Sequence, residues 1–418
     1  MKQYVIIGNG VAACGCIEGI RSVDKESSIT VVSKENHPVY GRPLISYYLE
    51  GHTTIDKMYY RQPDFYETNQ CKVLYGVEAK SLNPESKEIL LSDGSKLKYD
   101  KLCVASGSSP FVPPFEGLET VEKKHTFMTI DDSLELEKDL TKDSKVLIIG
   151  AGLIGLKCAE GILNRVKKIT VCDMADRVLS SIMDEKCASM VQTHLEEKGI
   201  EFILSDSVKR FEGNKAYFNS ERTEEFDCLV LAVGVRANTG FVKDAKALVN
   251  RGIVVDTSMK TSLEDVYAAG DCTESYDSSS GTNKVMAILP NAYFEGKCAG
   301  ENMAGKDTGL ENEIPMNSIG FFGFHTMSAG SYYTEESGGK EYVFEEKDSL
   351  RKFYTKDGVL TGFILINATD KAGIYTGLIR NKVKLDTVDW ESLLAEPKLF
   401  AFSRAYRDEV LANKKQSN

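Results

Sequence analysis

The stretch that most constrains this chain is Lys145–Asp173, KVLIIGAGLIGLKCAEGILNRVKKITVCD. An apolar strand runs into a Gly-x-Gly-x-x-Gly turn, and a helical pattern then continues to about Arg165. A second strand, centred on Ile169–Val171, ends on the acid Asp173. A glycine-rich segment alone can be a plain structural turn. In this strand–turn–helix–strand order, however, the pattern favours a dinucleotide-binding fold.

Each residue type in this turn has a physical task. Gly150 permits the tight turn, and Gly152 lets the backbone approach a pyrophosphate. Gly155 lets the helix pack closely against the strand. Leu153 and Ile154 start the helix, whose amino end faces the phosphate charge. We expect these five residues to form the dinucleotide-binding turn.

The acid at the end of the second strand indicates which dinucleotide is bound. Asp173 is placed to accept hydrogen bonds from both hydroxyls of the adenosine ribose. Its negative charge would also repel a 2′-phosphate. This half of the chain therefore predicts an NAD site rather than an NADP site.

The start of the chain, MKQYVIIGNGVAACGCIEGIR, is a second copy of the same unit. Gly8 and Gly10 supply the turn, and Ala13 takes the place of the third glycine, where a small residue still permits close packing. The second strand, Ser28–Val32, is followed slightly late by Glu35, which we predict to bind a ribose. Two such units in one chain imply two dinucleotides held face to face, FAD in one fold and a nicotinamide in the other.

Composition narrows the class further. The 418 residues suffice for two or three domains, and 42% hydrophobic with 27% charged residues is ordinary for a globular protein. A net charge of −11 argues against binding to nucleic acid or to an anionic membrane. Ten dispersed cysteines without a C-x-x-C motif predict neither a disulfide scaffold nor a metal site. Together with a start that leads directly into a strand, they predict a cytoplasmic protein without a signal peptide.

A local basic patch could nevertheless receive a protein partner, although a solvated charged surface is the plainer interpretation. Its members lie near the C-terminus: Lys382, Lys384, Arg404, Arg407, Lys414 and Lys415.

The segment HPVYGRPLISYYLEG contains the pattern Y-x-R-P-x-x-S in Tyr40, Arg42, Pro43 and Ser46. Here the chain resembles the FAD-dependent pyridine nucleotide oxidoreductases, in particular the rubredoxin-, ferredoxin- and nitrite-reductase-type NADH reductases. The resemblance implies that Arg42 lies on the FAD, with its charge toward the pyrophosphate or the reduced flavin. Relatives often have a lysine where this chain has Tyr47.

The resemblance also points to an absence. In the branch of the family that uses a redox-active cysteine beside the flavin, the corresponding position is Pro43 here. Cys14 and Cys16, two residues apart on one helix, are expected to be packing residues. No cysteine is visibly placed to take electrons from the flavin.

Further motifs extend the resemblance to nearly the whole chain. Ala105–Pro110 resembles the A-T-G-x-x-P segment, and Gly270-Asp271 the G-D motif whose aspartate bonds the FAD ribityl chain. Glu160 corresponds to a glutamate near the flavin–nicotinamide junction, although a solvent-facing helix glutamate is an equal alternative. Gly234 would let the nicotinamide approach the backbone. The residues expected at FAD are Gly8, Gly10, Ala13, Lys34, Glu35, Arg42, Pro43, Ala79, Ser106, Gly107, Gly270, Asp271, Asn291 and Ala292.

The expected architecture is α/β, with two Rossmann-like dinucleotide-binding domains and a C-terminal α+β domain. Residues 118–240 form the NAD domain, inserted in an FAD domain made of residues 1–117 and 241–310. Residues 311–418 form the third domain, which in relatives serves the flavin face, dimer contact or partner docking. A polar insertion at residues 276–283 is expected to be a surface loop, and Lys398–Lys415 an amphipathic helix.

The predicted function is hydride transfer from NADH to FAD, followed by electron transfer to a rubredoxin, a ferredoxin or an iron–sulfur subunit, in either direction. Two alternatives stay open. One is an NADH oxidase or peroxidase that uses oxygen or peroxide directly, and the other is a redox-sensing interaction protein that binds FAD and NADH. A homodimer is compatible with all three. No side chain other than Glu160 is proposed to take part in catalysis, because both hydride partners are cofactor atoms.

Overall fold

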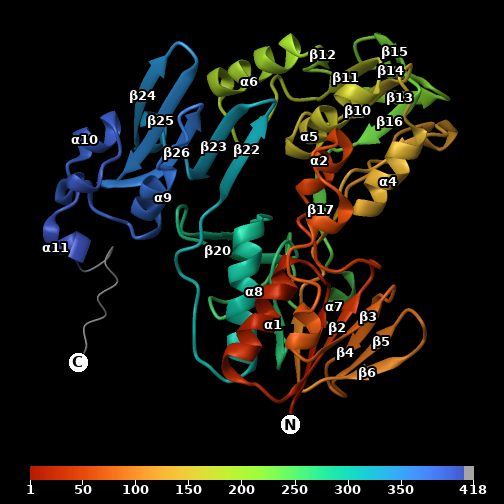
Figure 1. Cartoon of the computed structure of the whole chain (residues 1–418), viewed down its shortest axis with the longest axis vertical. Coiled ribbons are helices and arrows are strands. Elements are labelled where there is room, and N and C mark those ends of the chain that lie inside the picture. The colour runs from red at the N-terminus through yellow and green to blue at the C-terminus, as the bar shows by residue number, and fades with distance from the viewer. Residues whose placement is uncertain (409–418) are drawn as a thin grey trace. The chain divides into compact units, whose positions relative to one another are not determined.

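The computed structural model describes residues 1–408 and divides the chain into two compact units (Figure 1). The first unit comprises Met1–Tyr276 and Asn283–Glu311, and the second comprises Asp277–Thr282 and the chain from Asn312 onward. The predicted fold class is confirmed by the mixed α/β architecture. The finer boundaries expected at residues 117, 240 and 310 stay predictions.

The first unit contains two parallel sheets of the same construction, each with five strands. The strands of the first sheet are, in spatial order, β19 (Val266–Ala268), β7 (Lys101–Val104), β1 (Gln3–Ile7), β2 (Ser28–Ser33) and β3 (Cys71–Tyr75). Those of the second are β12 (Ile200–Ile203), β11 (Lys168–Cys172), β10 (Lys145–Ile149), β16 (Cys228–Leu231) and β9 (Lys124–His125). Their strands are continuous apolar runs, as parallel strands covered on both faces require.

Helices cover these sheets and carry the glycine turns at their amino ends. The longer helices of the first unit are α1 (Val11–Val23), α2 (Leu44–Glu50), α4 (Ile130–Asp139), α5 (Leu153–Ile162), α6 (Glu185–Glu197) and α8 (Leu289–Met303). The short helices are α3 (Phe65–Thr68) and α7 (Gly240–Asp244). Both α1 and α5 begin directly after the second glycine of their turn, so the two predicted units have the same local structure.

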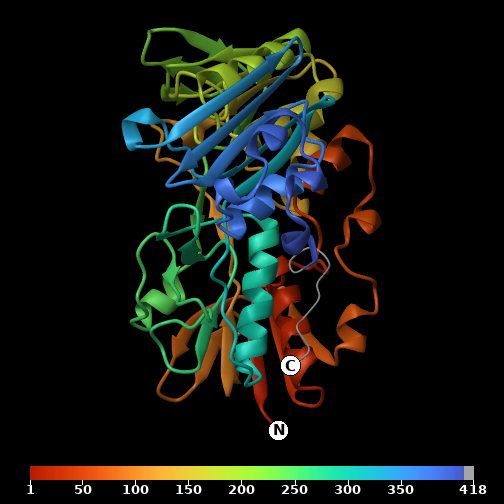
Figure 2. The same cartoon turned by 90° about the vertical axis from the view of Figure 1, so that its left-hand side faces the viewer.

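Helices α1 and α8 lie side by side with their backbones in contact (Figure 2). A Cβ atom built on Gly296 would lie 1.9 Å from the carbonyl oxygen of Ala12, and one on Gly15 2.2 Å from that of Tyr293. Gly19 and Gly300 are equally close to the facing backbone. Alternating glycines from both helices therefore permit an approach that no larger residue would.

The two nucleotide folds are joined by a short antiparallel pair, β8 (Ser108–Pro110) with β17 (Val235–Ala237). A second junction is formed by α2 and α5, where Gly161 packs on the backbone of Ser46. Three small sheets follow: β4 (Ala79–Asn83), β5 (Glu88–Leu91) and β6 (Lys96–Lys98); β13 (Val208–Glu212), β14 (Lys215–Phe218) and β15 (Thr223–Glu225); and β18 (Ile253–Val254), β20 (Thr273–Asp277) and β21 (Thr282–Lys284). They belong to the first unit except for Asp277 and Thr282, the facing ends of β20 and β21, which belong to the second.

The surface loop expected at residues 276–283 is found only in part: Gly281, Thr282 and Asn283 are exposed, whereas Asp277 and Ser278 are buried. The segment is the turn between β20 and β21, and Asp277 is 0% exposed. Its carboxylate accepts hydrogen bonds from Ser279 and Ser280, and the amide of Ser278 donates to the carbonyl of Glu313. A polar sequence can be buried when its groups bond each other, and this one packs within the second unit.

The second unit is an antiparallel sheet with helices, which matches the predicted α+β character. Its strand order is β22 (Met316–Phe321), β23 (Phe324–Gly330), β26 (Val359–Ile366), β25 (Ser349–Lys356) and β24 (Lys340–Glu346), followed by α9 (Ala372–Arg380), α10 (Trp390–Ala395) and α11 (Arg404–Tyr406).

The helix expected over Lys398–Lys415 is not continuous. Leu399–Ala401 is a 3-10 turn, and α11 starts only at Arg404. Phe402 is buried and stacks on Tyr406, as expected of packing residues, whereas Phe400 is 85% exposed. The rest of this segment, with Lys414 and Lys415 of the proposed basic patch, lies outside the described residues.

Candidate functional site

A cleft of about 440 Å³ opens at the carboxyl edge of the first sheet, within the first unit. Parallel α/β sheets bind ligands at this edge. Its walls come from the first glycine turn, the end of β2, the segment before α2, the β8 region, the start of α4, the turn after β19 and the start of α8. Of the residues expected at FAD, these line it: Gly8, Gly10, Lys34, Glu35, Arg42, Ser106, Gly107, Gly270, Asp271 and Ala292.

The first glycine turn is built for a close ligand. Gly8 has φ of +105°, and a Cβ there would lie 2.0 Å from the carbonyl oxygen of Ala105. Gly10 caps α1 in extended conformation, and a Cβ there would meet no atom within 4 Å. The first position is thus fixed by the fold, whereas the second leaves open space where a pyrophosphate would approach the amino end of α1.

Glu35 and Arg42, which the sequence analysis treated separately, form an ion pair. The hydroxyl of Tyr40 donates to Glu35 at 2.5 Å, and an Arg42 nitrogen donates to the carbonyl of Met128 at 3.1 Å. A carboxylate has about four acceptor positions, so Glu35 can bond further donors. The expected contacts of Glu35 with a ribose and of Arg42 with the flavin or pyrophosphate stay predictions.

Asp271 lies in the turn after β19, on the opposite wall. Gly270 before it has φ of +82°, and the Asp271 carboxylate accepts a hydrogen bond from the hydroxyl of Ser108 at 3.0 Å. Burial raises the pKa of Asp271, while the Ser108 bond and the charge of Arg42 oppose the rise. A partly buried carboxylate with acceptor positions left suits the hydroxyls of a sugar-like chain.

Asn238, which follows β17, also lines the cleft. Its side-chain amide donates to the carbonyl of Ser106 at 2.9 Å and accepts from the hydroxyl of Ser109 at 2.8 Å. Its backbone amide donates to the carbonyl of Gly107 at 2.9 Å. The end of the second nucleotide fold is therefore tied directly to the loop that lines the first fold's cleft.

The second glycine turn repeats the geometry of the first. Gly150 has φ of +115° with its Cβ position 2.2 Å from the carbonyl oxygen of Ala232, and a Cβ on Gly155 would lie 1.9 Å from the Gly150 oxygen. Gly152, at the amino end of α5, again has open space. Leu153 and Ile154 form the first positions of α5, as expected.

The Asp173 carboxylate is held at this turn. One oxygen accepts the amide of Ala151 at 2.7 Å and the other the amide of Ala175 at 2.8 Å. These bonds fix its negative charge beside the glycine turn. Its predicted contact with a ribose would use the remaining acceptor positions and stays a prediction.

Glu160 does not face solvent, so that alternative is wrong. It is 5% exposed and forms an ion pair with Lys157, whose ammonium lies 4.5 Å from the ring centroid of Tyr47. The pair thus sits where α5 meets α2. Gly234 has φ of +109°, and its carbonyl accepts the amide of Phe111 at 2.9 Å.

Four residues expected at FAD do not line the cleft: Ala13, Pro43, Ala79 and Asn291. Ala13 is buried beneath the turn, and Pro43 caps α2.

The start of α4 was not expected at the cleft from the sequence. Thr129 and Asp132 form a capping box there and also line the cleft. The Thr-x-x-Asp spacing could have predicted this cap. His37 and Asp131 contact each other at 2.8 Å on the cleft rim. No local sequence pattern predicts this contact.

All ten cysteines lie within the described residues, and all are free thiols. Nine are buried, Cys71 is intermediate, and none lines the cleft. Burial raises the pKa of Cys14 and of Cys272 to about 12, which keeps these thiols neutral and unreactive. Within residues 1–408 no cluster of three His, Cys, Asp or Glu side chains could hold a metal ion. No helix in that range combines the length and apolarity needed to cross a membrane.

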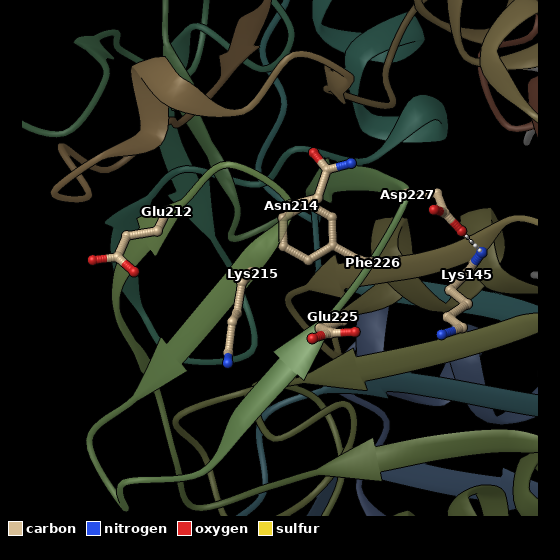
Figure 3. A pocket seen from close by; sticks show the side chains of 7 residues that line it. All are labelled: Lys145, Glu212, Asn214, Lys215, Glu225, Phe226 and Asp227. Carbon is tan, nitrogen blue, oxygen red and sulfur yellow. Dashed lines mark hydrogen bonds between the residues drawn. The ribbon is translucent and has the colours of Figure 1, made fainter.

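A second cavity of about 340 Å³ lies in the second nucleotide fold (Figure 3). It is found at the amino end of β10, where the Lys145 amide donates to Asp227 at 2.8 Å. The second glycine turn follows the other end of this strand, so this cavity is not the dinucleotide site. Its remaining lining is Glu212, Asn214, Lys215, Glu225 and Phe226.

Two glycine turns with open second positions and a buried acidic cleft define a protein that binds two dinucleotides. The family model for pyridine nucleotide-disulphide oxidoreductase matches residues 2–296, and the chain belongs to this family. It is therefore an FAD-dependent NAD(H) oxidoreductase. The residues present fit dinucleotide cofactors, because each glycine turn leaves open space at the amino end of a helix; the assignment of FAD to the first turn and of NAD(H) to the second stays a prediction.

The chain is similar along most of its length to two curated proteins. One is the epsilon subunit of NADH-dependent phenylglyoxylate dehydrogenase from Aromatoleum evansii, which is 32% identical over 92% of this chain and 92% of the relative. The other is NADH-rubredoxin oxidoreductase from Clostridium acetobutylicum, 28% identical over 79% of this chain and 82% of the relative. The structure of the covalent putidaredoxin reductase–putidaredoxin complex has a TM-score of 0.84, at 22% identity over 95% of this chain and 99% of that one.

Proposed function

We propose that this protein passes electrons from NADH, by way of bound FAD, to an iron–sulfur carrier such as a rubredoxin or ferredoxin, or to an iron–sulfur subunit of a larger enzyme. FAD, when bound, supplies the hydride acceptor and can release electrons one at a time. The observation that carries the proposal is a cofactor cleft without a thiol. Electrons that cannot pass to a cysteine must leave to an outside acceptor.

The names of two relatives support the proposed electron transfer from NADH to a protein acceptor. One is named as a subunit of an NADH-dependent dehydrogenase, and the other as a reductase of rubredoxin. We propose a reducing compartment, the cytoplasm, because the ten thiols are free.

The chain's own residues have three proposed tasks. The amino ends of α1 and α5 present backbone amides to the two pyrophosphates. Asp271 accepts hydrogen bonds from FAD, and Arg42, positioned by Glu35 and Tyr40, supplies positive charge beside it. The contact of Lys157 with Tyr47 and the Asn238 bonds hold the two folds at their junctions, so that the two dinucleotides meet in a fixed orientation.

The test is anaerobic reduction of the holoprotein by NADH, followed by stopped-flow reoxidation. We expect rapid reoxidation by a rubredoxin or ferredoxin and slow reoxidation in air-saturated buffer. Fast reaction with oxygen or peroxide alone would overturn the proposal in favour of an oxidase or peroxidase. Slow reaction with every acceptor, with a persistent NADH-bound form, would favour a redox sensor.

Asp173 gives a specificity prediction. Asp173→Ser removes the charge that opposes a 2′-phosphate, so the ratio of kcat/KM for NADH to that for NADPH should fall by about 100-fold, corresponding to ~3 kcal/mol. The matched control is Asp176→Ser, because Asp176 is exposed and forms an ion pair with its neighbour Arg177. A wild-type preference for NADPH, or an unchanged ratio in Asp173→Ser, would refute the assignment.

A further inference from the structure

Glu295 is a buried carboxyl behind the wall of the FAD cleft. It lies on α8, one turn after the cleft-lining Ala292, and is 1% exposed. One oxygen accepts the amide of Gly270 at 2.7 Å and the hydroxyl of Thr273 at 3.0 Å. The other accepts the hydroxyl of Ser275 at 2.6 Å. One side chain thus holds both the turn after β19 and the start of β20 against α8.

The turn held in this way is part of the cofactor site. Gly270 and Asp271 line the cleft, and Gly270 adopts positive φ against Ala12 of α1, which also lines it. The amide of Gly270 points away from the cleft, to Glu295, so its hydrogen bond fixes the plane of the peptide before Gly270. The direction of Asp271 therefore depends on Glu295.

The groups that face Glu295 are few. Asp271 is the charged group that acts on Glu295, and the thiols of Cys272, Cys298 and, on β7, Cys103 lie close enough to feel its charge. Burial raises the pKa of Cys272 and Cys298 to about 12, so they carry no charge. Burial likewise raises the pKa of Glu295 to about 7, and its three hydrogen bonds oppose that rise only in part.

We propose that Glu295 is a positioning residue for FAD, which holds the Gly270–Asp271 turn through one hydrogen bond and the start of β20 through two, and makes FAD affinity depend on its own charge. FAD brings a doubly charged pyrophosphate into a cleft that already holds Asp271. An additional buried negative charge disfavours this, so bound FAD favours the neutral form of Glu295. The proposal rests on FAD binding alone and is independent of the electron acceptor.

The sign of the pH dependence follows from linkage. If FAD binding raises the pKa of Glu295, the complex takes up a proton, and affinity falls as pH rises through about 7. A rise of one unit in this pKa on binding would weaken FAD about fivefold between pH 6 and pH 8. Glutamine has the shape of the neutral carboxyl: its oxygen accepts from Gly270 and its amide donates to Ser275.

The experiment measures FAD release from the diluted holoprotein by flavin fluorescence at pH 6, 7 and 8. We expect the affinity of the wild type for FAD to weaken about fivefold from pH 6 to pH 8. Glu295→Gln should stay near the wild-type value of pH 6 throughout, and Glu295→Leu should bind FAD about 10–100-fold more weakly at every pH. Glu301→Gln is the control, since Glu301 lies on the same helix but pairs with Lys306. The FAD affinity of Glu301→Gln should depend on pH as that of the wild type does.

A pH dependence retained in Glu295→Gln, or wild-type affinity in Glu295→Leu, would overturn the proposal. Infrared spectroscopy gives a second test, which does not need the leucine variant. The infrared carbonyl band of a protonated carboxyl should be present in the wild-type holoprotein at pH 6, weaken toward pH 8 and be missing from Glu295→Gln. The same band unchanged in the glutamine variant would also overturn it.

Discussion

Gly10→Ala should give a folded protein that has lost most of its FAD, and Gly152→Ala a folded FAD protein that NADH no longer reduces efficiently. Both residues cap their helices at negative φ, and a Cβ at either position meets no protein atom within 4 Å. The added methyl group therefore strains only the approach of a pyrophosphate. Overpacking of this size costs about 1–3 kcal/mol, which corresponds to an affinity loss of about 10–100-fold.

The two variants act as controls for each other. FAD content is read from the absorbance of the purified protein, and the affinity for NADH from the concentration dependence of flavin reduction. Gly240→Ala is a further control, because a Cβ at Gly240 also meets no atom within 4 Å. Full FAD occupancy in Gly10→Ala, or an unchanged NADH affinity in Gly152→Ala, would show that the turns do not receive the dinucleotides in this way.

Gly296→Ala should have the largest effect on stability. Its Cβ would lie 1.9 Å from the carbonyl oxygen of Ala12, a backbone atom, so α1 and α8 must separate. We expect a loss of about 3 kcal/mol in the free energy of unfolding of the first unit. Because α1 starts at the FAD turn, FAD should be released at a lower temperature as well.

Thermal denaturation followed by circular dichroism and by flavin fluorescence measures both effects, with Gly240→Ala again as the control. An unchanged melting temperature in Gly296→Ala would contradict the backbone contact between α1 and α8.

The parts of the site that could be predicted are those dictated by local sequence. Gly8 and Gly150 have positive φ and close backbone neighbours, so a glycine there is a physical requirement of the turn, and the flanking apolar runs identify it. The parallel strand order of the two sheets follows from the same repeated unit.

The rest depends on contacts between distant residues. The bonds of Glu295 to Gly270 and of Asn238 to Ser106 join segments that are separated in sequence. No periodic pattern in the sequence predicts these bonds. Glu35 and Arg42 were both assigned to the cofactor, but their pairing requires knowledge of how the chain turns before α2. Asp277 shows the opposite error, because its polar neighbours predict exposure but bond to it and permit burial.

The central claim is that FAD carries the redox chemistry and that none of the ten cysteines, all within residues 1–408, shares its electrons. An anaerobic titration of the holoprotein with NADH, followed by flavin absorbance, tests this most directly. The account predicts complete bleaching at one NADH, or two electrons, per FAD. Uptake of four electrons per FAD, or a thiolate-to-flavin charge-transfer band during the titration, would contradict it and identify one of the ten cysteines as a second redox centre.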